Sequence, residues 1–394
     1  MAKEAFVVAA CRTPIGNYQG TLSPLQATEL GAITIREAVR RSGVAGEDVD
    51  DLIMGHVVQA GTGQAPARQA AIGGGLPATV PCLTINKVCG SGLKAVMLAA
   101  QSIKAGDSEV VVAGGMESLS NAPYALKKAR SGYRLGHGEL VDIMIHDGLW
   151  DSFNNFHMGS AAEYTAEKSG ITRERQDEFA AGSHAKAVAA TLAGKFEAEI
   201  VPVSVPVRKG DPVSFDVDEC PRGDNTATAL ARLRPAFQKE GTVTAGNAPG
   251  LNDGASCTVV ASEHAVKAHN LKPLARIVAY ATAGVEPKEL FYAPIYAVEM
   301  LMKKMGVTID HFDLIEANEA FSVQALVDGD GLGWDWSRVN VHGGAVALGH
   351  PIGASGARVL TTLLYALKDR NLKTGLATLC LGGGNAVALA VERV

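Results

Sequence analysis

The stretch Cys89 to Lys104 reads CGSGLKAVMLAAQSIK, in which a Gly/Ser-rich start precedes a long apolar helix. It leads to the apolar strand EVVVA at Glu109 to Ala113, which runs into two glycines. The same order returns near the other end of the chain, where HPIGASGARVLTTLLYALK at His350 to Lys368 leads to GLATL at Gly375 to Leu379 and again to glycines. A helix and a strand that occur twice in this order indicate an internal duplication.

Two further pairs of segments extend this repeat outward. Ala5 to Ala10 (AFVVAA) is similar to Ala275 to Ala281 (ARIVAYA), and both favour buried strands. Val49 to His56 (VDDLIMGH) is similar to Phe312 to Asn318 (FDLIEAN), where acidic residues precede a short apolar strand. Strands that alternate with helices and are apolar throughout predict an α/β layered fold whose sheets are covered by helices. Two such halves would form a pseudo-dimer within one chain.

The segment between the halves, from about Ser118 to Asn247, has a different composition. It is richer in charge and in Pro, Gly and turn signals, and it has helical stretches at Ser160 to Lys168 and Arg173 to Ala193. A segment of this length is too long for a structureless loop inside a compact domain, so we predict a loop domain that covers the ligand. The predicted division is an N-terminal half at 1–118, the loop domain at 119–248, a return segment at 249–271 that completes the N-terminal half, and a C-terminal half at 272–394.

Composition limits the function classes. The 394 residues are 47% hydrophobic and carry a formal net charge of −5, with the basic residues spread along the chain. This pattern argues against a nucleic-acid binder or a protein of anionic membranes. The N-terminal apolar run is too short for a signal peptide, and no run reaches the roughly 18 apolar residues of a membrane span. Six cysteines without a C-x-x-C pair fit a reducing cytoplasm.

Cys89 and His350 stand at equivalent places in the repeat, each just before a helix. A helix N-terminus favours a thiolate, so Cys89 suits a nucleophile, although a buried structural cysteine is the alternative. If the halves pack about a pseudo-twofold axis, the two helix starts approach each other and the imidazole can activate the thiol. The alternative for His350 is a histidine that merely completes a turn.

Cys380 and Asn318 each stand near the end of a predicted strand. Cys380 is followed by glycines that let backbone N–H groups approach a ligand, and such donors can stabilise an oxyanion. Its alternative is a core cysteine at a strand end. Asn318 precedes a helix, so its alternative is a helix N-cap.

Four blocks, in order, carry a resemblance to a known family: CGSG at Cys89, NEAF at Asn318, GHPIGASGAR around His350 and CLGGGNA at Cys380. Together they resemble the thiolase family, and the resemblance covers roughly residues 4 to 392. It implies a five-layered α/β/α/β/α fold made of two duplicated halves with an inserted loop domain.

The resemblance also implies a role for each catalytic residue. Cys89 matches the nucleophile that receives an acyl group from an acyl-CoA, and His350 matches the histidine that activates it and faces the thioester oxygen. Cys380 matches the acid/base cysteine, and Asn318 the residue that holds a water in one oxyanion hole. A second hole would use the backbone N–H groups of Cys89 and Gly382.

The resemblance implies a short-chain substrate. Asn155 to Gly159 (NFHMG) follows Leu149 and Phe153 in a block that is similar to the acyl cover of short-chain members. The alternative for its aromatic and Met residues is simple core packing. Arg222 would meet the nucleotide end of CoA. The expected substrate-binding residues are Leu149, His157, Met158, Arg222, Phe237, Ala245, Pro249, Ala320 and Phe321.

The sequence departs from the family pattern in three places. Pro249 stands where relatives have a serine that touches CoA, and it offers neither a hydroxyl nor an N–H. Ala229 occupies a position that is often serine, and Asn385-Ala386 replaces the commoner Met/Gln-Gly. The stretch Leu290 to Ala297, with Pro273 to Val285, is similar to mitochondrial acetoacetyl-CoA thiolases, some of which bind potassium near the CoA. We expect no cofactor apart from the CoA of the substrate, no other metal, and potassium only as an ion to test.

The expected activity is the joining of two acetyl-CoA molecules into acetoacetyl-CoA and CoA, or the reverse, through an acyl group on Cys89. A second catalytic thiol, Cys380, favours this chemistry over decarboxylative condensation, because ketoacyl synthases carry a second His or an Asn there. A broad-range 3-ketoacyl-CoA thiolase of β-oxidation is the nearer alternative, and a non-catalytic acyl-CoA-binding protein the more distant one. The resemblance implies a homotetramer built as a dimer of dimers, with no nucleic-acid or membrane partner.

Overall fold

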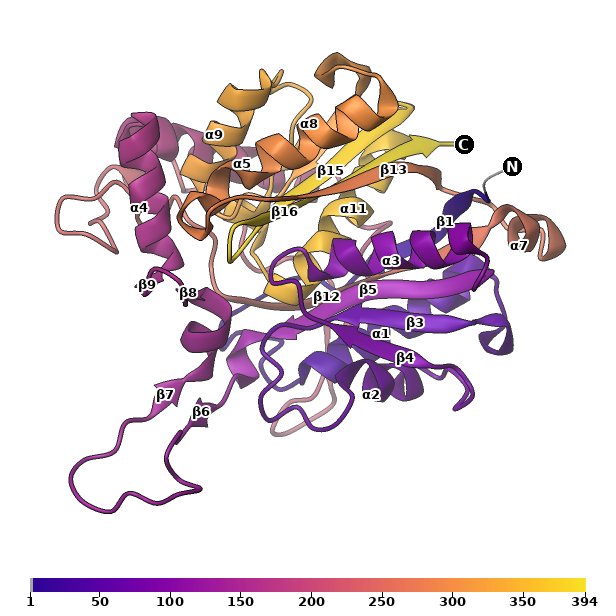
Figure 1. Ribbon diagram of the computed structural model, residues 1–394, viewed down its shortest axis with the longest axis horizontal. Coiled ribbons are helices and arrows are strands. Elements are labelled where there is room, and N and C mark those ends of the chain that lie inside the picture. Colours follow the sequence, from indigo (N-terminus) through magenta and orange to yellow (C-terminus); the bar gives the residue numbers. More distant parts are fainter. Residues whose placement is uncertain (1–2) are drawn as a thin grey trace.

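The computed structural model describes residues 3–394 and builds them around a ten-stranded mixed sheet (Figure 1). The sheet runs through both halves of the chain, and each half contributes its strands as a block. In spatial order the strands are β14 (Leu314–Ala317), β15 (Thr374–Leu381), β16 (Asn385–Arg393), β13 (Ala275–Gly284), β1 (Ala5–Arg12), β12 (Asn252–Ser262), β5 (Val110–Ser118), β3 (Asp51–Gly55) and β4 (Cys82–Ile85), with β2 (Gly16–Asn17) pairing to β12.

The strand order repeats between the halves. β1, β12, β5 and β3 follow one another in the N-terminal half just as β13, β16, β15 and β14 do in the C-terminal half. In each block the last two strands are parallel and the others antiparallel. The blocks join where Phe6 and Val7 of β1 pair with Arg276 and Ala275 of β13. The predicted similarities between segments therefore correspond to equivalent strands.

Helices divide the molecule into five layers. α1 (Ala27–Ser42) covers one outer face and contacts β1, β5 and β12, with α2 (Pro66–Gly73) beside it. α3 (Ser91–Ala105) and α11 (Ile352–Asp369) lie in the centre and contact strands of both halves. α8 (Ala293–Met305) covers β13 and β16 on the other outer face. The predicted layered fold is confirmed.

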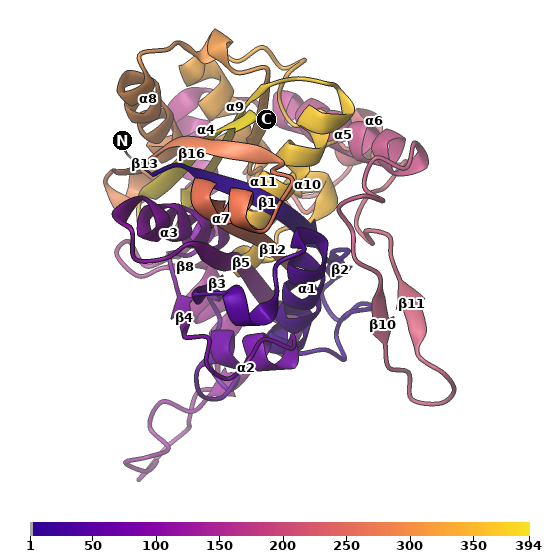
Figure 2. The ribbon, with the colours of Figure 1, turned by 90° about the vertical axis from the view of Figure 1, so that its right-hand side faces the viewer.

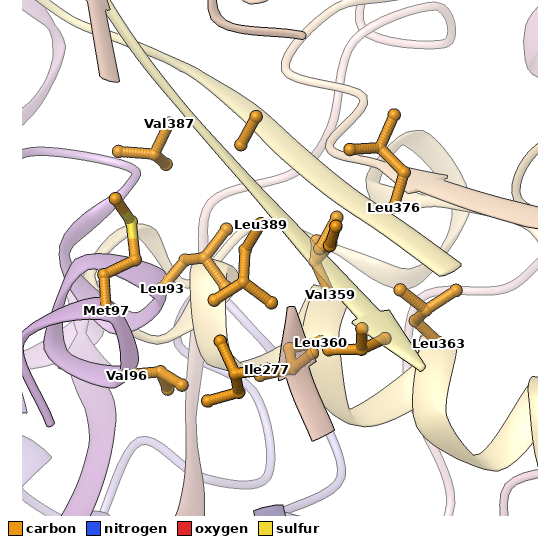
Figure 3. Packing of buried hydrophobic residues seen from close by; sticks show 14 of the residues in the cluster. Leu93, Val96, Met97, Ile277, Val359, Leu360, Leu363, Leu376, Val387 and Leu389 are labelled. Carbon is orange, nitrogen blue, oxygen red and sulfur yellow. The ribbon is translucent and has the colours of Figure 1, made fainter. Parts of the chain in front are cut away.

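The largest apolar core fills the space between the two central helices and the C-terminal strands. Leu93 and Met97 of α3 and Val359 of α11 meet Leu389 of β16 there (Figure 3). Fully burying such a side chain contributes about 1.5–3 kcal/mol relative to leaving it exposed. The apolar faces that predicted long helices in the sequence thus become the contact between the halves.

Two glycines let the central helices touch at their first turns. A Cβ on Gly92 of α3 would come within 2.7 Å of the Ala357 backbone nitrogen, and a Cβ on Gly356 of α11 would collide with the Leu93 backbone nitrogen. Contacts this close are open only to residues without a side chain. The starts of α3 and α11, which carry Cys89 and His350, are therefore held next to each other.

The loop domain is ordered around two helices. α4 (Met158–Ser169) and α5 (Arg173–Leu192) confirm the two helices predicted there, and the Thr172 hydroxyl caps α5 by accepting from Arg175 N. The buried Arg12 of β1 anchors this domain through ion pairs of 2.6 Å to Glu199 and 2.7 Å to Asp218. Its other elements are β6 (Tyr124–Ala125), β7 (Val141–Asp142), the π-helix η3 (Met144–Leu149), β8 (Trp150–Asp151), β9 (Phe156–His157), β10 (Val203–Val205), β11 (Val213–Phe215) and α6 (Ala227–Leu230).

Two segments project from the body. The chain between β6 and β7 forms a long arm (Figure 1), and the β10–β11 hairpin extends from another side (Figure 2). No helix within residues 3–394 is long and apolar enough to cross a membrane. The remaining helices are α7 (Glu263–Ala268), α9 (Ser322–Leu332), α10 (Ala345–Leu348) and the 3-10 turns η1 (Gly46–Asp48), η2 (Leu119–Asn121), η4 (Pro287–Tyr292) and η5 (Ile309–His311).

Candidate active site

A cavity of 340 Å³ is lined by residues from both halves and from the loop domain. Most residues predicted for the site border it, and they come from segments up to three hundred positions apart along the chain. Two predicted residues, Arg222 and Asn318, do not belong to its lining. The predicted residues that do line it are Cys89, Leu149, His157, Met158, Phe237, Ala245, Pro249, Ala320, Phe321, His350, Cys380 and Gly382.

Cys89 follows a tight turn between β4 and α3. Val88 has a left-handed backbone with φ +46°, which is unusual for a β-branched residue and costs on the order of 1–3 kcal/mol. The turn is held by Asn86 Oδ1, which accepts from Val88 N at 2.9 Å, and by Ser91 Oγ, which accepts from Lys87 N at 2.8 Å and donates to Val88 O. Backbone strain of this kind persists where the surroundings fix a reactive side chain.

The Cys89 thiol opens partly onto the cavity, but its surroundings are apolar. Burial raises the pKa of this thiol to about 12, although the backbone N–H groups of Gly382 and of Cys89 itself favour the thiolate. Desolvation therefore outweighs the helix terminus in the free protein, and the thiol is protonated at rest. The thiol therefore needs a base to become a nucleophile. The backbone N–H groups of Gly382 and Cys89 face its sulfur.

His350 lies between α10 and α11 with its ring orientation fixed. Its backbone N–H donates to Asn252 Oδ1 at 2.8 Å, and its Nδ1 lies 2.6 Å from Ser355 Oγ. The Ser355 hydroxyl donates its only proton to Pro351 O, so it accepts from Nδ1–H of the ring. Nε2 is then the nitrogen with a free lone pair. Because burial lowers the pKa of His350 to about 3, the ring is a neutral base at rest.

Cys380 is the last residue but one of β15 and precedes a turn in which Gly383 and Gly384 have positive φ. Burial raises the pKa of its thiol well above the ordinary value, and negative charge on Cys89 and Asp328 raises it further. Cys89 and Cys380 line the same cavity. Both are protonated at neutral pH, and a thiolate formed at Cys380 would be strongly basic.

Asn318 lies behind the cavity wall, between β14 and α9. The residue that caps α9 is Phe321, so the alternative reading of Asn318 as a helix N-cap is wrong. Its backbone N–H donates to Thr378 O at 3.0 Å, but neither side-chain atom has a partner among the described residues. A fully buried amide without partners is costly unless water or a ligand satisfies it. The side chain is therefore suited to hold a water molecule.

Aromatic rings form the wall contributed by the loop domain. The His157 ring stacks on Phe237 with 5.0 Å between ring centroids, and Phe237 meets Phe321 edge-on at 6.4 Å. His157 also caps α4, since its Nδ1 accepts from Gly159 N at 3.0 Å. Burial lowers the pKa of His157, so this wall is uncharged.

The predicted nucleotide-binding arginine lies outside this wall. Arg222 is exposed, and its backbone N–H donates to His184 Nδ1 at 3.2 Å. Pro249 and Ala245 line the cavity, and neither side chain carries a polar atom. The cavity thus offers room for an acyl group and its thioester, while Arg222 stands at the surface.

Several residues that shape the site were not singled out in the sequence. Ser355, which orients His350, lies inside the quoted block GHPIGASGAR, five positions after the histidine. Apolar periodicity does not indicate a contact between these two polar residues. Asn252 holds the His350 backbone from a strand almost one hundred residues earlier. Their roles depend on contacts between the halves. The other lining residues with apolar side chains, none of which was assigned to the site from the sequence, are Val88, Leu119, Met144, Ile145, Ala236, Ala248, Leu251, Leu290, Phe291 and Ile352.

Comparisons with known proteins bear on the whole chain. The family models described as thiolase N-terminal domain and thiolase C-terminal domain match residues 5–264 and 271–393. An acetyl-CoA acetyltransferase of Pseudomonas aeruginosa is 55% identical over 99% of this chain and 100% of its own length. One of Cupriavidus necator is 56% identical over 99% of both chains. A crystal structure of the Bacillus anthracis acetyl-CoA acetyltransferase superposes with a TM-score of 0.98 at 45% identity, covering 100% of this chain and 99% of the other. This chain belongs to the thiolase family.

Proposed function

We propose that this protein is an acetyl-CoA C-acetyltransferase, which condenses two acetyl-CoA molecules to acetoacetyl-CoA and CoA, reversibly, through an acetyl group on Cys89. The observation that carries the proposal is that Cys89, His350, Cys380 and Gly382 line one cavity. Full-length relatives with the name acetyl-CoA acetyltransferase support the acetyl substrate. Acetyl-CoA, acetoacetyl-CoA and CoA are then its ligands.

The first half-reaction acetylates Cys89. His350 Nε2 takes the thiol proton, and the thiolate attacks the thioester carbonyl of acetyl-CoA. The backbone N–H groups of Cys89 and Gly382 stabilise the oxyanion of the tetrahedral intermediate. When this intermediate collapses, the carbon–sulfur bond to CoA breaks, and the CoA thiolate takes the proton from the imidazolium. His350 returns to the neutral form that its burial favours.

The second half-reaction forms the carbon–carbon bond. The Cys380 thiol first gives its proton to the neutral His350 at Nε2, and the resulting thiolate removes a methyl proton from a second acetyl-CoA, while the His350 imidazolium and a water held by Asn318 stabilise the enolate oxygen. The carbanion attacks the acetyl carbonyl on Cys89, the bond to the Cys89 sulfur breaks, and this sulfur recovers a proton from Cys380 as acetoacetyl-CoA leaves. Cys380 then takes back its own proton from the imidazolium, so both thiols and the neutral His350 are restored. The raised pKa of Cys380 suits this role because the proton next to a thioester is weakly acidic.

The test is mass spectrometry of the protein after treatment with acetyl-CoA. We expect one acetyl group on the peptide that contains Cys89, with release of one equivalent of CoA, and neither in Cys89→Ser. Cys82→Ser is the matched control, because Cys82 is a half-buried thiol that does not line the cavity. An unmodified Cys89 with bound acetyl-CoA would instead favour a non-catalytic acyl-CoA-binding protein.

The cavity also bears on chain length. The stacked His157 and Phe237 rings and Phe321 close its acyl side, which favours an acetyl or acetoacetyl group over a long chain. A broad-range 3-ketoacyl-CoA thiolase is the second candidate. Rates of cleavage of acetoacetyl-CoA and of a long-chain 3-ketoacyl-CoA separate the two, and a preference for the long chain would reject our choice.

We propose that the reaction needs no cofactor besides the CoA of its substrates, since the cavity residues supply the nucleophile, the base and the oxyanion donors. Potassium near Leu290 to Ala297 stays a proposal to test. The carboxylate there, Glu289, already contacts Lys168 Nζ and accepts from Tyr164 Oη at 2.6 Å, so a cation would have to rely on backbone carbonyls. Equal activity in potassium and in a larger inert cation would reject it.

We also propose a cytoplasmic homotetramer, built as a dimer of dimers. Six free cysteines support a reducing compartment. Two exposed features support assembly: the edge strand β4, where Leu83 is 47% exposed, and the arm between β6 and β7, where Leu135 is 97% exposed. Light scattering should give four copies, and two copies once a short Gly/Ser link replaces residues 127–139.

A further inference from the structure

Glu117 is a fully buried carboxylate that the reaction proposed above does not use. It is the last residue but one of β5, and three backbone N–H groups converge on its oxygens. Val57 N donates to Oε2 at 3.2 Å, Val58 N to Oε1 at 3.1 Å, and Gly353 N to Oε2 at 2.8 Å. The fourth neighbour is His56 Nε2, 3.4 Å from Oε1.

The three donors belong to two sides of the candidate site. Val57 and Val58 follow β3 and pack in the apolar cluster that Cys89 joins. Gly353 lies in the first turn of α11, three residues after His350. One carboxylate from the N-terminal half therefore holds both the wall beside the nucleophile and the helix start that carries the base. Burying an acidic group is costly, so such a contact is kept only where several hydrogen bonds repay it.

Among residues 3–394, no buried cation balances the charge of Glu117. Burial lowers the pKa of His56 to about 4, so its ring is neutral at physiological pH. The other titratable groups around Glu117 are Asp253 on β12 and Cys89 before α3, which would carry negative charge if ionised, and His350 before α11, which is neutral at rest. A negative Glu117 opposes a second negative charge on the Cys89 sulfur.

We propose that Glu117 is a positioning residue of the catalytic centre, which locks the first turn of α11 against the wall beside Cys89 and, when ionised, holds back formation of the Cys89 thiolate. The inference rests on the proposed function for its kinetic part only. Its electrostatic part concerns a thiol in the free protein and can be tested without a substrate.

The pH range of the effect follows from the surroundings of Glu117. Burial raises the pKa of its carboxyl to about 7, and the N–H groups of Val58, Gly353 and Val57 limit the rise. Below this pH Glu117 is protonated and neutral, and above it the carboxylate is charged. Its influence on Cys89 is therefore absent in acid and present in alkaline solution.

The test compares Glu117→Gln with the native full-length protein by the rate of iodoacetamide alkylation at Cys89, followed by peptide mass spectrometry from pH 6 to pH 9. The amide keeps an oxygen for Gly353 N and Val57 N but carries no charge. We expect nearly equal rates at pH 6 and a rate about threefold or more above the native one at pH 8.5, because removing a nearby negative charge lowers a thiol pKa. Superimposable profiles would overturn the electrostatic part.

Asn252→Ala is the matched control for charge. Asn252 also holds the His350 segment from the N-terminal half, by accepting from His350 N, but it is neutral. Its variant should leave the ratio of alkylation rates to the native protein constant across the pH range. A ratio that rises with pH in this control as in Glu117→Gln would reject a charge effect.

The positioning part is tested by thiolysis of acetoacetyl-CoA. In Glu117→Ala, which releases α11, we expect kcat to fall about 10- to 100-fold with KM within about twofold, and Glu117→Gln to restore most of kcat. A fall in thermal stability with kcat unchanged would reject positioning. If Glu117→Ala does not fold, Glu117→Asp replaces it, because the shorter carboxylate cannot reach the N–H groups on both sides, and native kcat in that variant rejects positioning equally. If Cys89 of the native protein is alkylated as expected but is never acetylated by acetyl-CoA, the proposed function is rejected and the electrostatic part of this inference is not.

Discussion

The two halves of the molecule share an architecture and differ in chemistry. α3 and α11 begin at equivalent places between the sheets, but one start presents the Cys89 thiol and the other the His350 imidazole. Gly55 pairs with Gly115 as Ala317 pairs with Thr378, so the position of β5 that is equivalent to Cys380 of β15 is Glu117. Duplication therefore supplied a scaffold with paired positions, and reactivity requires that the members of each pair differ, since two thiols or two imidazoles at the helix starts would give no nucleophile–base pair.

The residues that directly follow β3 and β14, which are equivalent strands of the two halves, show the same contrast. His56 follows β3 and Asn318 follows β14 at aligned positions, and both are buried. His56 contacts Glu117, which completes a structural contact inside the N-terminal half. The Asn318 side chain has no partner among the described residues. His56 Nδ1 also lacks a partner among the described residues, but Asn318 leaves both of its side-chain polar atoms unpaired, so the C-terminal half is where a ligand or water is expected.

The strongest test of this division is removal of the nucleophile. We expect Cys89→Ser to lower kcat for acetoacetyl-CoA thiolysis by at least about 1,000-fold, because a serine hydroxyl is a much poorer nucleophile at the same place. Steady-state kinetics and a stopped-flow assay of CoA release measure it. A variant with more than a tenth of native activity would show that the N-terminal half does not carry the acyl group.

A second test separates the two thiols. In Cys380→Ser we expect acetylation of Cys89 to proceed at a rate within about tenfold of the native one, while condensation falls by about 100- to 10,000-fold, since only the later step needs a base at this position. Mass spectrometry follows the first step and a coupled assay the second. If the rates of Cys89 acetylation and of condensation fall by the same factor, Cys380 is not specific to the condensation step.

Part of this arrangement was predictable from the sequence because it is local. Apolar periodicity and the repeated order of segments were enough for the layered fold, and the glycines after Cys380 pointed to a turn that approaches a ligand. The state of the Cys89 thiol was not predictable, because it depends on desolvation by Val57, Val58 and other residues distant in the chain. The interpretation of Asn318 as a helix N-cap was wrong because three residues separate it from Ser322, where α9 begins. Sequence periodicity does not locate a helix start to within three residues.

The contact between the halves can be broken at a single glycine. Gly356→Ala should lower the free energy of unfolding by about 1–3 kcal/mol, because its Cβ would collide with the Leu93 backbone nitrogen and force α3 and α11 apart. Denaturant unfolding measures it. Gly182→Ala in α5 is the matched control, since a Cβ there meets no atom within 4 Å, and it should be neutral or slightly stabilising. If Gly182→Ala lowers the free energy of unfolding by as much, the effect comes from replacing a helical glycine and not from the contact between α3 and α11.

The smallest expected effect concerns the orientation of the His350 ring in the C-terminal half. Ser355→Ala removes the acceptor of His350 Nδ1–H, so the ring can exchange tautomers and present a protonated Nε2 to the thiol. We expect kcat to fall about tenfold with little change in KM, and Cys89 acetylation to slow by the same factor. Ser322→Ala is the matched control, because the buried Ser322 hydroxyl has no partner within residues 3–394 and contacts no catalytic group by hydrogen bonding. If both variants keep native kinetics, the ring orientation must come from the Asn252 contact with the His350 backbone, and the N-terminal half then positions the imidazole without help from α11.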